Sequence, residues 1–252
     1  MRLPLNKLAV LAFTILVSLS TMLWFLANGS LNEYLKSQIE IQGHYYSGQD
    51  TTVELADFSS STGTGEFKSF SLDNLNGHQA KHALVIDLAH IELVRQPTQP
   101  LLTTIKEITI NKLTLNIETI LGSPSNIDQL IETITIKLAH DFPELYPNIS
   151  AKIYAKNNPQ LNAVEYAQNN PQAGPIIDHK KPKKKRGKPQ AKINIASITI
   201  HTVELNIINE GLAKKIALNN MNIRVIGGNE GVISNQLGGE VLLALLNLAQ
   251  QS

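Results

Sequence analysis

The segment ITINKLTLNI, residues 108–117, occurs a second time as ITIHTVELNI, residues 198–207. In both copies apolar and polar residues alternate, and the alternation skips one position in the middle. Alternation with a period of two is typical of a β-strand with one buried face, and one extra residue at the skip, a β-bulge, keeps both halves on that face. The repeat therefore predicts two long, bent strands, whose apolar positions are Ile108, Ile110, Leu113, Leu115 and Ile117 in the first copy and Ile198, Ile200, Val203, Leu205 and Ile207 in the second.

The same pattern predicts further strands. It recurs at residues 84–93 and 216–225, with shorter versions at 53–58 and 67–72. Glycine and asparagine between several of these segments favour tight turns and antiparallel neighbours. A strand over residues 105–117 would extend for about 40 Å, which is longer than a typical strand and indicates a curved sheet. We therefore expect an α+β fold with a long, curved, bulged, mainly antiparallel sheet and one or two packing helices.

Two segments follow helical spacing instead. Residues 125–140 place apolar side chains on one helical face, with Ser125 or Asn126 as the N-cap and Asp128 in the first turn. The β-branched residues 133–136 leave a strand as the alternative there. Residues 240–250, which follow the pair Gly238 and Gly239, predict a closing helix.

The amino-terminal segment has the pattern of a membrane anchor. Arg2 and Lys7 precede residues 8–27, which carry no charge and as a helix would span roughly 30 Å. The length of this run favours a retained anchor, while a signal peptide cleaved before Ser30 and a buried helix of a soluble protein remain alternatives. The positive charges before the run predict a cytoplasmic amino end and export of everything from Ser30 onward. In a bacterium this means a single-pass inner-membrane protein with its bulk in the periplasm.

Composition divides the chain into four parts. We expect an anchor at residues 1–29, a β-rich domain formed by 30–155 and 191–252, and a disordered insertion at 156–190 that is rich in Lys, Pro and Asn. The insertion is interpreted as a solvated linker, or as a segment attracted to anionic phospholipid or lipopolysaccharide; nucleic-acid binding is disfavoured because export removes the chain from such targets. Its basic residues are Lys180, Lys181, Lys183, Lys184, Lys185, Arg186 and Lys188.

The sequence contains no catalytic signature. It has no cysteine and no nucleotide-binding, nucleophile-elbow or zinc-protease motif. His78 and His82 have a spacing that would suit a metal on a helix, but turn residues precede them and favour a loop. We expect no enzymatic activity, no metal and no cofactor.

The order of these features resembles the AsmA-like family of bacterial inner-membrane-anchored periplasmic proteins. The resemblance rests on the anchor, on GTGEFKSFSLDNLNGHQAKHALVIDLAHIEL (63–93), on ITINKLTLNIE (108–118), on GSPSNIDQL (122–130) and on KINIASITIHTVELNI (192–207). Leu75 and His78 depart from the family's turn, which usually has proline and an aromatic residue at these positions. The resemblance implies a curved sheet with an apolar concave face and a role in phospholipid transport or outer-membrane homeostasis.

Two hypotheses follow for the apolar face of the predicted sheet. In the first, lipid acyl chains cover it, lined by Ile108, Ile110, Leu113, Leu115, Ile198, Ile200, Val203 and Leu205. In the second, the predicted helices cover it completely, and the protein is a non-catalytic scaffold or assembly factor for other envelope proteins. Something must cover this face, because 400 Å² of apolar surface left in water forfeits roughly 10 kcal/mol of burial free energy.

Overall fold

The computed structural model describes residues 31–94, 101–150, 191–209 and 211–251. The expected anchor at 1–29, the following Ser30 and the basic insertion at 156–190 lie outside the described residues. The predictions for these segments therefore stay predictions. Within the described ranges, no helix has the length and apolar character needed to cross a membrane.

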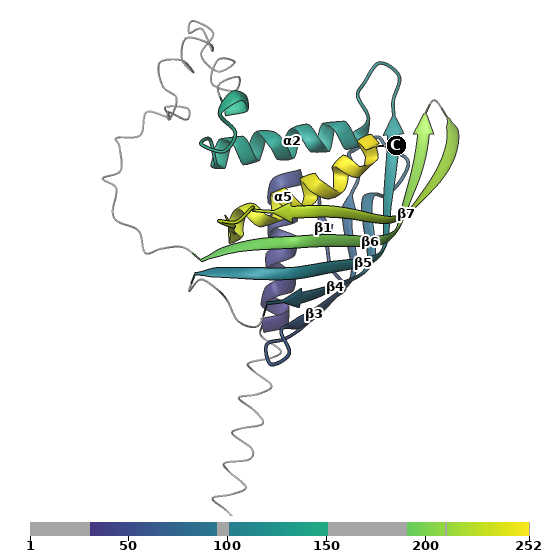
Figure 1. Cartoon of the computed structure of the whole chain (residues 1–252). Helices are drawn as coiled ribbons and strands as arrows, with labels where there is room; N and C mark the ends of the chain where they lie inside the picture. Colours follow the sequence, from purple (N-terminus) through teal and green to yellow (C-terminus); the bar gives the residue numbers. More distant parts are fainter. Residues whose placement is uncertain (1–30, 95–100, 151–190, 210, 252) are drawn as a thin grey trace, which may run out of the picture.

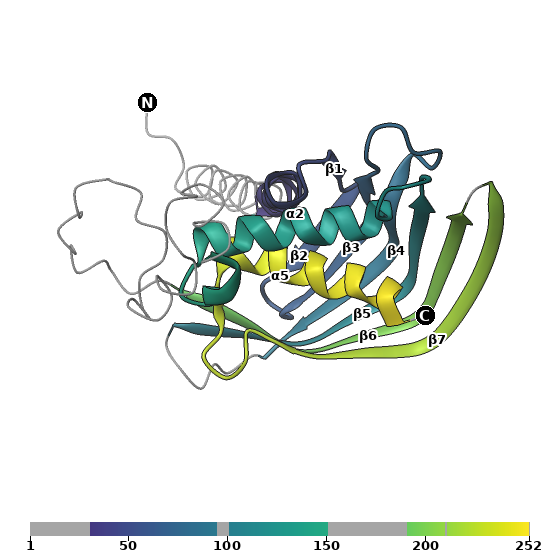
Figure 2. The ribbon, with the colours of Figure 1, turned by 90° about the horizontal axis from the view of Figure 1, so that it is seen from above.

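The described residues form an α+β fold built on one large, mixed sheet, as the sequence predicts. Its strands lie in the order β1-β3-β4-β5-β6-β7, with β2 also beside β3 and β8 also beside β6. Figures 1 and 2 show that the sheet is strongly curved. The strands are β1 (Thr51–Thr52), β2 (Leu55–Ser59), β3 (Thr64–Asp73), β4 (His82–Leu93), β5 (Leu102–Thr119), β6 (Lys192–Asn209), β7 (Leu212–Ile226) and β8 (Val232–Ile233).

The two copies of the repeated segment lie side by side at the centre of the sheet. Strands β5 and β6 pair in parallel, with Ile108 in register with Ile198 and Leu115 in register with Leu205. The expectation of antiparallel neighbours is therefore wrong for this one pair, and it holds for the other strand pairs. The chain between β5 and β6 contains a helix and a long insertion, which is the kind of connection that parallel strands require.

The skip in the alternation is present, but it is not an isolated bulge. Ile86 pairs with Leu113 and Ala89 with Ile110, so β4 and β5 both advance three residues at the same place. The same three-residue step is matched between β5 and β6 and between β6 and β7. Neighbouring strands therefore keep their register across the bend. We call the line across the sheet where the strands make this step the crease. Its residues are Ser69, Asp87, Leu88, Asn111, Lys112, His201, Thr202, Asn219 and Asn220.

Helix α2 (Asn126–Asp141) confirms the prediction for residues 125–140. The Ser125 hydroxyl accepts a hydrogen bond from the Asp128 backbone N–H at 3.1 Å and donates one to the Asp128 carboxylate at 2.7 Å. This second bond holds the pKa of Asp128 below its ordinary value. The N-cap is therefore Ser125, one of the two residues that the sequence suggests.

The closing helix begins earlier than predicted. Helix α5 spans Ser234–Leu246 and continues as a 3-10 helix, η1, at Asn247–Gln251, so the glycine pair lies inside the helix. A Cβ on Gly238 would lie 2.5 Å from the Gln42 Oε1 atom, and one on Gly239 would lie 3.0 Å from the Tyr46 ring. The glycines thus permit close packing of helices here, and the prediction that the helix begins after them is wrong.

The core lies between the concave face of the sheet and the two helices α2 and α5, which cross that face in Figure 2. Helix residues of this core include Leu130, Ile134, Leu138, Leu242 and Leu246, each 4% exposed or less. A further helix, over residues 31–47, was not predicted; it lies beside the edge formed by β1 and β2.

Candidate functional site

The eight residues predicted to line a lipid groove lie together in the hydrophobic core. Their exposed fractions range from 0 to 8%. The same core cluster contains apolar side chains of α2 and α5, which cover this part of the concave face. The centre of the face is therefore filled by the protein's own helices, and an acyl chain could reach these eight side chains only if a helix moved away.

The concave face continues beyond the helices toward strand β7. There the aliphatic side chains are half-buried, and Leu212 at the start of β7 is 79% exposed. Lys214 is in register with Ile207 and is exposed, so a cation lies at the border of this apolar surface. We call this region the outer strip; its members are Ile117, Ile207, Ile216, Leu218, Met221 and Ile223.

A buried polar cluster ties the end of β5 to the turn between β3 and β4. Glu118 is 4% exposed, and its carboxylate accepts hydrogen bonds from the backbone N–H groups of Gln79 and Ala80, both at 2.6 Å. It also accepts one from the Asn74 side-chain amide at 3.2 Å. Three donors therefore compensate the burial of this carboxylate.

Asn126, the first residue of α2, connects the same cluster to the helix. Its amide donates to the Asn74 side-chain oxygen and to the Asn116 carbonyl, both at 2.8 Å, while its oxygen accepts from the Glu118 N–H at 2.8 Å. Asn126 is fully buried. This role of Glu118 was not predicted, because the asparagines beside the turn and at the helix start have no fixed sequence spacing to Glu118.

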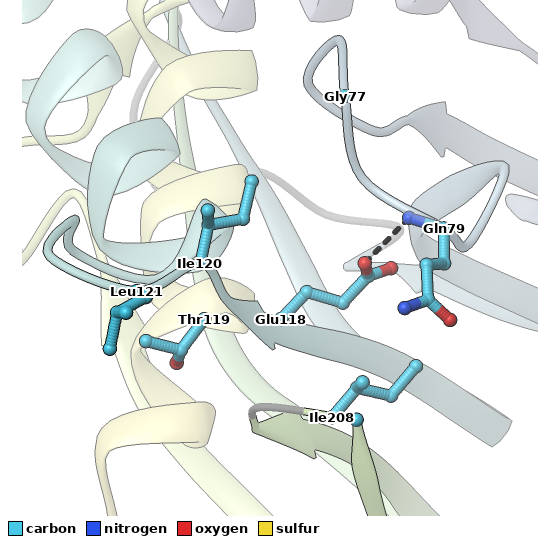
Figure 3. A pocket seen from close by; sticks show the side chains of 8 residues that line it. Gly77, Gln79, Glu118, Thr119, Ile120, Leu121 and Ile208 are labelled. Atoms are coloured by element: carbon cyan, nitrogen blue, oxygen red, sulfur yellow. Dashed lines mark hydrogen bonds between the residues drawn. The ribbon is translucent and has the colours of Figure 1, made fainter.

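An open depression of about 420 Å³ lies next to this cluster. Figure 3 shows Glu118 directed toward Gln79 on one side of it, with the aliphatic side chains of Ile120, Leu121 and Ile208 around it. Leu121 is 82% exposed. The depression thus combines one fully bonded carboxylate with exposed apolar side chains, an arrangement that offers contact surface.

The two histidines considered as metal ligands have different partners. His82 Nδ1 lies 2.8 Å from the Asp73 carboxylate, whereas His78 Nδ1 lies 3.7 Å from that of Glu118, beyond hydrogen-bond distance. Across the part of the chain that the structure describes, no three His, Cys, Asp or Glu side chains are grouped to hold a metal ion.

The convex face carries paired charges instead of an apolar surface. Glu204 on β6 accepts from Lys112 at 2.8 Å and from Lys215 at 3.0 Å. These bonds, the Lys112 bond foremost, lower the pKa of the Glu204 carboxyl. The two faces of the central strands are therefore distinct in chemistry, with aliphatic side chains on the concave side and ion pairs on the convex side.

Comparison with known proteins adds no family to this description. Neither a protein-family model nor a curated protein matches the chain.

Proposed function

We propose that this protein is a non-catalytic, membrane-anchored envelope protein that accommodates lipid acyl chains on the outer strip. In this proposal it acts in phospholipid transport or outer-membrane homeostasis in the periplasm. The observation that carries the proposal is the outer strip itself, where six aliphatic residues from three neighbouring strands share one concave face and stay half-buried. A contiguous, partly solvated aliphatic surface of this kind favours an apolar ligand.

The border of the strip supports a lipid in particular. An acyl chain lying on Ile207 and Ile216 would bring its head group close to Lys214, which is in register with Ile207. A lysine ammonium attracts an anionic phosphate, and its aliphatic stem can lie along the apolar surface. The uncharged run at residues 8–27 supports a location at a membrane, where such lipids are available.

A second candidate function, an envelope scaffold or assembly factor, is favoured by a different observation. The eight central residues of the concave face are sealed under α2 and α5, as a closed core would require. In that case the outer strip and the exposed Leu121 and Leu212 would be contact surface for another protein.

Site-specific photocrosslinking in intact cells separates the two candidates. A photoreactive amino acid at position 207 of the full-length chain is expected to yield a phospholipid adduct, detected by mass spectrometry of the purified protein. The matched control is position 213, which directly precedes Lys214, is exposed and lies on the opposite face of β7. Position 205, beneath the helices, should give no adduct.

The outcomes are distinct. Lipid at position 207 but not at 213 supports the lipid proposal. Protein adducts at 207 without lipid favour the scaffold, and equal lipid labelling at 207 and 213 would mean only general contact with the bilayer.

A further inference from the structure

Strand β7 forms a long, open edge of the sheet. It has 15 residues and pairs with β6 on one side, and the described residues contain no strand on its other side. Such an edge presents a row of backbone donors and acceptors that can pair with another strand. Its concave side carries Ile216, Leu218, Met221 and Ile223, all half-buried, so an added strand would also bury apolar surface.

The crease restricts which strand can pair with this edge. In every long pair of the sheet that crosses the crease, both partners make the three-residue step at the same place, as Ile200 to Val203 does opposite Met221 to Leu218. Asn220, on the crease in β7, has a positive φ of 55°. A partner without this step would leave one residue of β7 unpaired as a bulge, so continuous pairing along the edge requires a partner that makes the same step opposite Asn219 and Asn220.

Strand β7 itself meets this requirement. We propose that β7 pairs antiparallel with β7 of a second copy of the chain, about a two-fold axis between Asn219 and Asn220. In that register Ile216 lies opposite Ile223 of the second copy, and Leu218 lies opposite Met221. The apolar positions are thus symmetric about the crease, which is what an isologous interface needs.

This register places Lys215 opposite a second cation, a repulsion that the Glu204 carboxylate offsets in part. Lys214 would lie opposite Val225, which has no charge. Lys215 would lie opposite position 224, an arginine, but Lys215 is already paired with Glu204 at 3.0 Å. An acidic extended peptide from another protein would suit these cations, but only a peptide with the matching step would pair continuously along the edge, and β7 of a second copy carries that step by identity.

The pairing joins two sheets into one with both concave faces on the same side. The outer strips of the two copies then meet at the seam. This inference does not depend on the lipid proposal, because it rests on backbone pairing and residue register.

Disulfide crosslinking tests the register directly, since the chain contains no cysteine. The double variant L218C/M221C, full-length and in membranes, should form an intermolecular disulfide on mild oxidation, because opposite residues in an antiparallel pair bring their Cβ atoms within bonding reach. The product should have twice the 27.7 kDa mass of one chain. The matched control is I216C/L218C, which has the same number of cysteines on the same face but places none opposite another.

We expect about tenfold more crosslinked dimer from L218C/M221C than from the control, because disulfide geometry tolerates little displacement. Equal yields from the two variants, or a crosslinked product containing a different protein, would overturn the proposal. Light scattering of the unmodified chain in detergent gives an independent measurement that no cysteine can disturb. A dimer mass supports the proposal, and a monomer mass together with no preferential crosslinking rejects it.

Discussion

The two edges of the sheet differ in how their backbone groups are satisfied. At the β1–β2 edge, side chains from the helix at 31–47 reach the strand backbone: Glu40 accepts from the Val53 N–H, and Asn32 accepts from the Phe58 N–H, both at 3.0 Å. Lys36 donates to the Glu54 carbonyl at 3.4 Å. At the opposite edge, the described residues place no comparable helix along β7.

Backbone groups of the β1–β2 edge are thus bonded within the chain, whereas those along the outer side of β7 have no partner strand among the described residues. An open edge of 15 residues is normally shortened, charged on its inner face or covered, because it invites association. Strand β7 instead keeps aliphatic residues on its inner face. The covered edge therefore contributes to stability within the chain, and the open edge is the one that the proposed pairing of two copies would use.

The largest expected effect compares a covered residue with one at the open edge. Leu205 is fully buried under the helices. The substitution Leu205→Ala should lower the unfolding free energy of the protein by about 2–5 kcal/mol, because it removes buried apolar surface and leaves a cavity. Leu218→Ala, on the half-buried outer strip, should lose about 1 kcal/mol or less. Denaturant unfolding of both variants measures the difference, and similar losses would show that the outer strip is part of the closed core.

A smaller effect is expected where the covering helices meet. Gly239→Val would place its side chain against the Tyr46 ring and the Leu138 side chain, at 3.0 and 2.9 Å from the new Cβ. Such overpacking costs about 1–3 kcal/mol, and it should loosen the helix at 31–47 from α5. Thermal unfolding together with hydrogen exchange at the β1–β2 edge measures both consequences. Gly228→Val is the control, since nothing lies within 4 Å of its Cβ position. Gly228 has a positive φ, so any loss of stability in this variant comes from local backbone strain. Hydrogen exchange at the β1–β2 edge should then stay unchanged.

The smallest expected effect concerns one edge contact. Asn32→Ala removes the bond to the Phe58 N–H and the 3.1 Å bond to the Asp57 carboxylate, at a cost of about 0.5–1.5 kcal/mol. Exchange of the Phe58 amide should become faster, while amides of β7 stay unchanged. Glu33→Ala, an exposed neighbour on the same helix, serves as the control. Unchanged exchange at Phe58 in the Asn32 variant would mean that the helix does not protect this edge.

The sequence pattern predicted the apolar face of the strands and the helix after Ser125, because alternation and capping are local signals. It did not predict that β5 and β6 are parallel, since direction depends on the path of the chain between them and not on either strand. The helix at 31–47 was missed because its apolar residues do not mark one face, since Tyr34, Ile41 and Tyr45 are exposed while Tyr46 lies in the core. Gly238 and Gly239 were misread because a glycine that permits close helix packing looks in sequence like one that ends a helix.

The same limit applies to the candidate site. Alternation identified which residues share the concave face, but it could not distinguish those sealed beneath α2 and α5 from those left half-buried on β7. Burial of Leu205 and partial exposure of Leu218 depend on where two helices rest, and that is decided by contacts distant in sequence.

The crease has one further consequence, for how this chain can change in length. Deleting a single residue such as Asn111 would leave β5 one residue shorter than its neighbours at the crease, so that β4 and β6 would each keep one residue there without a partner. The bend is therefore a property of the whole sheet, and a change of length at the crease preserves continuous pairing only when adjacent strands change together.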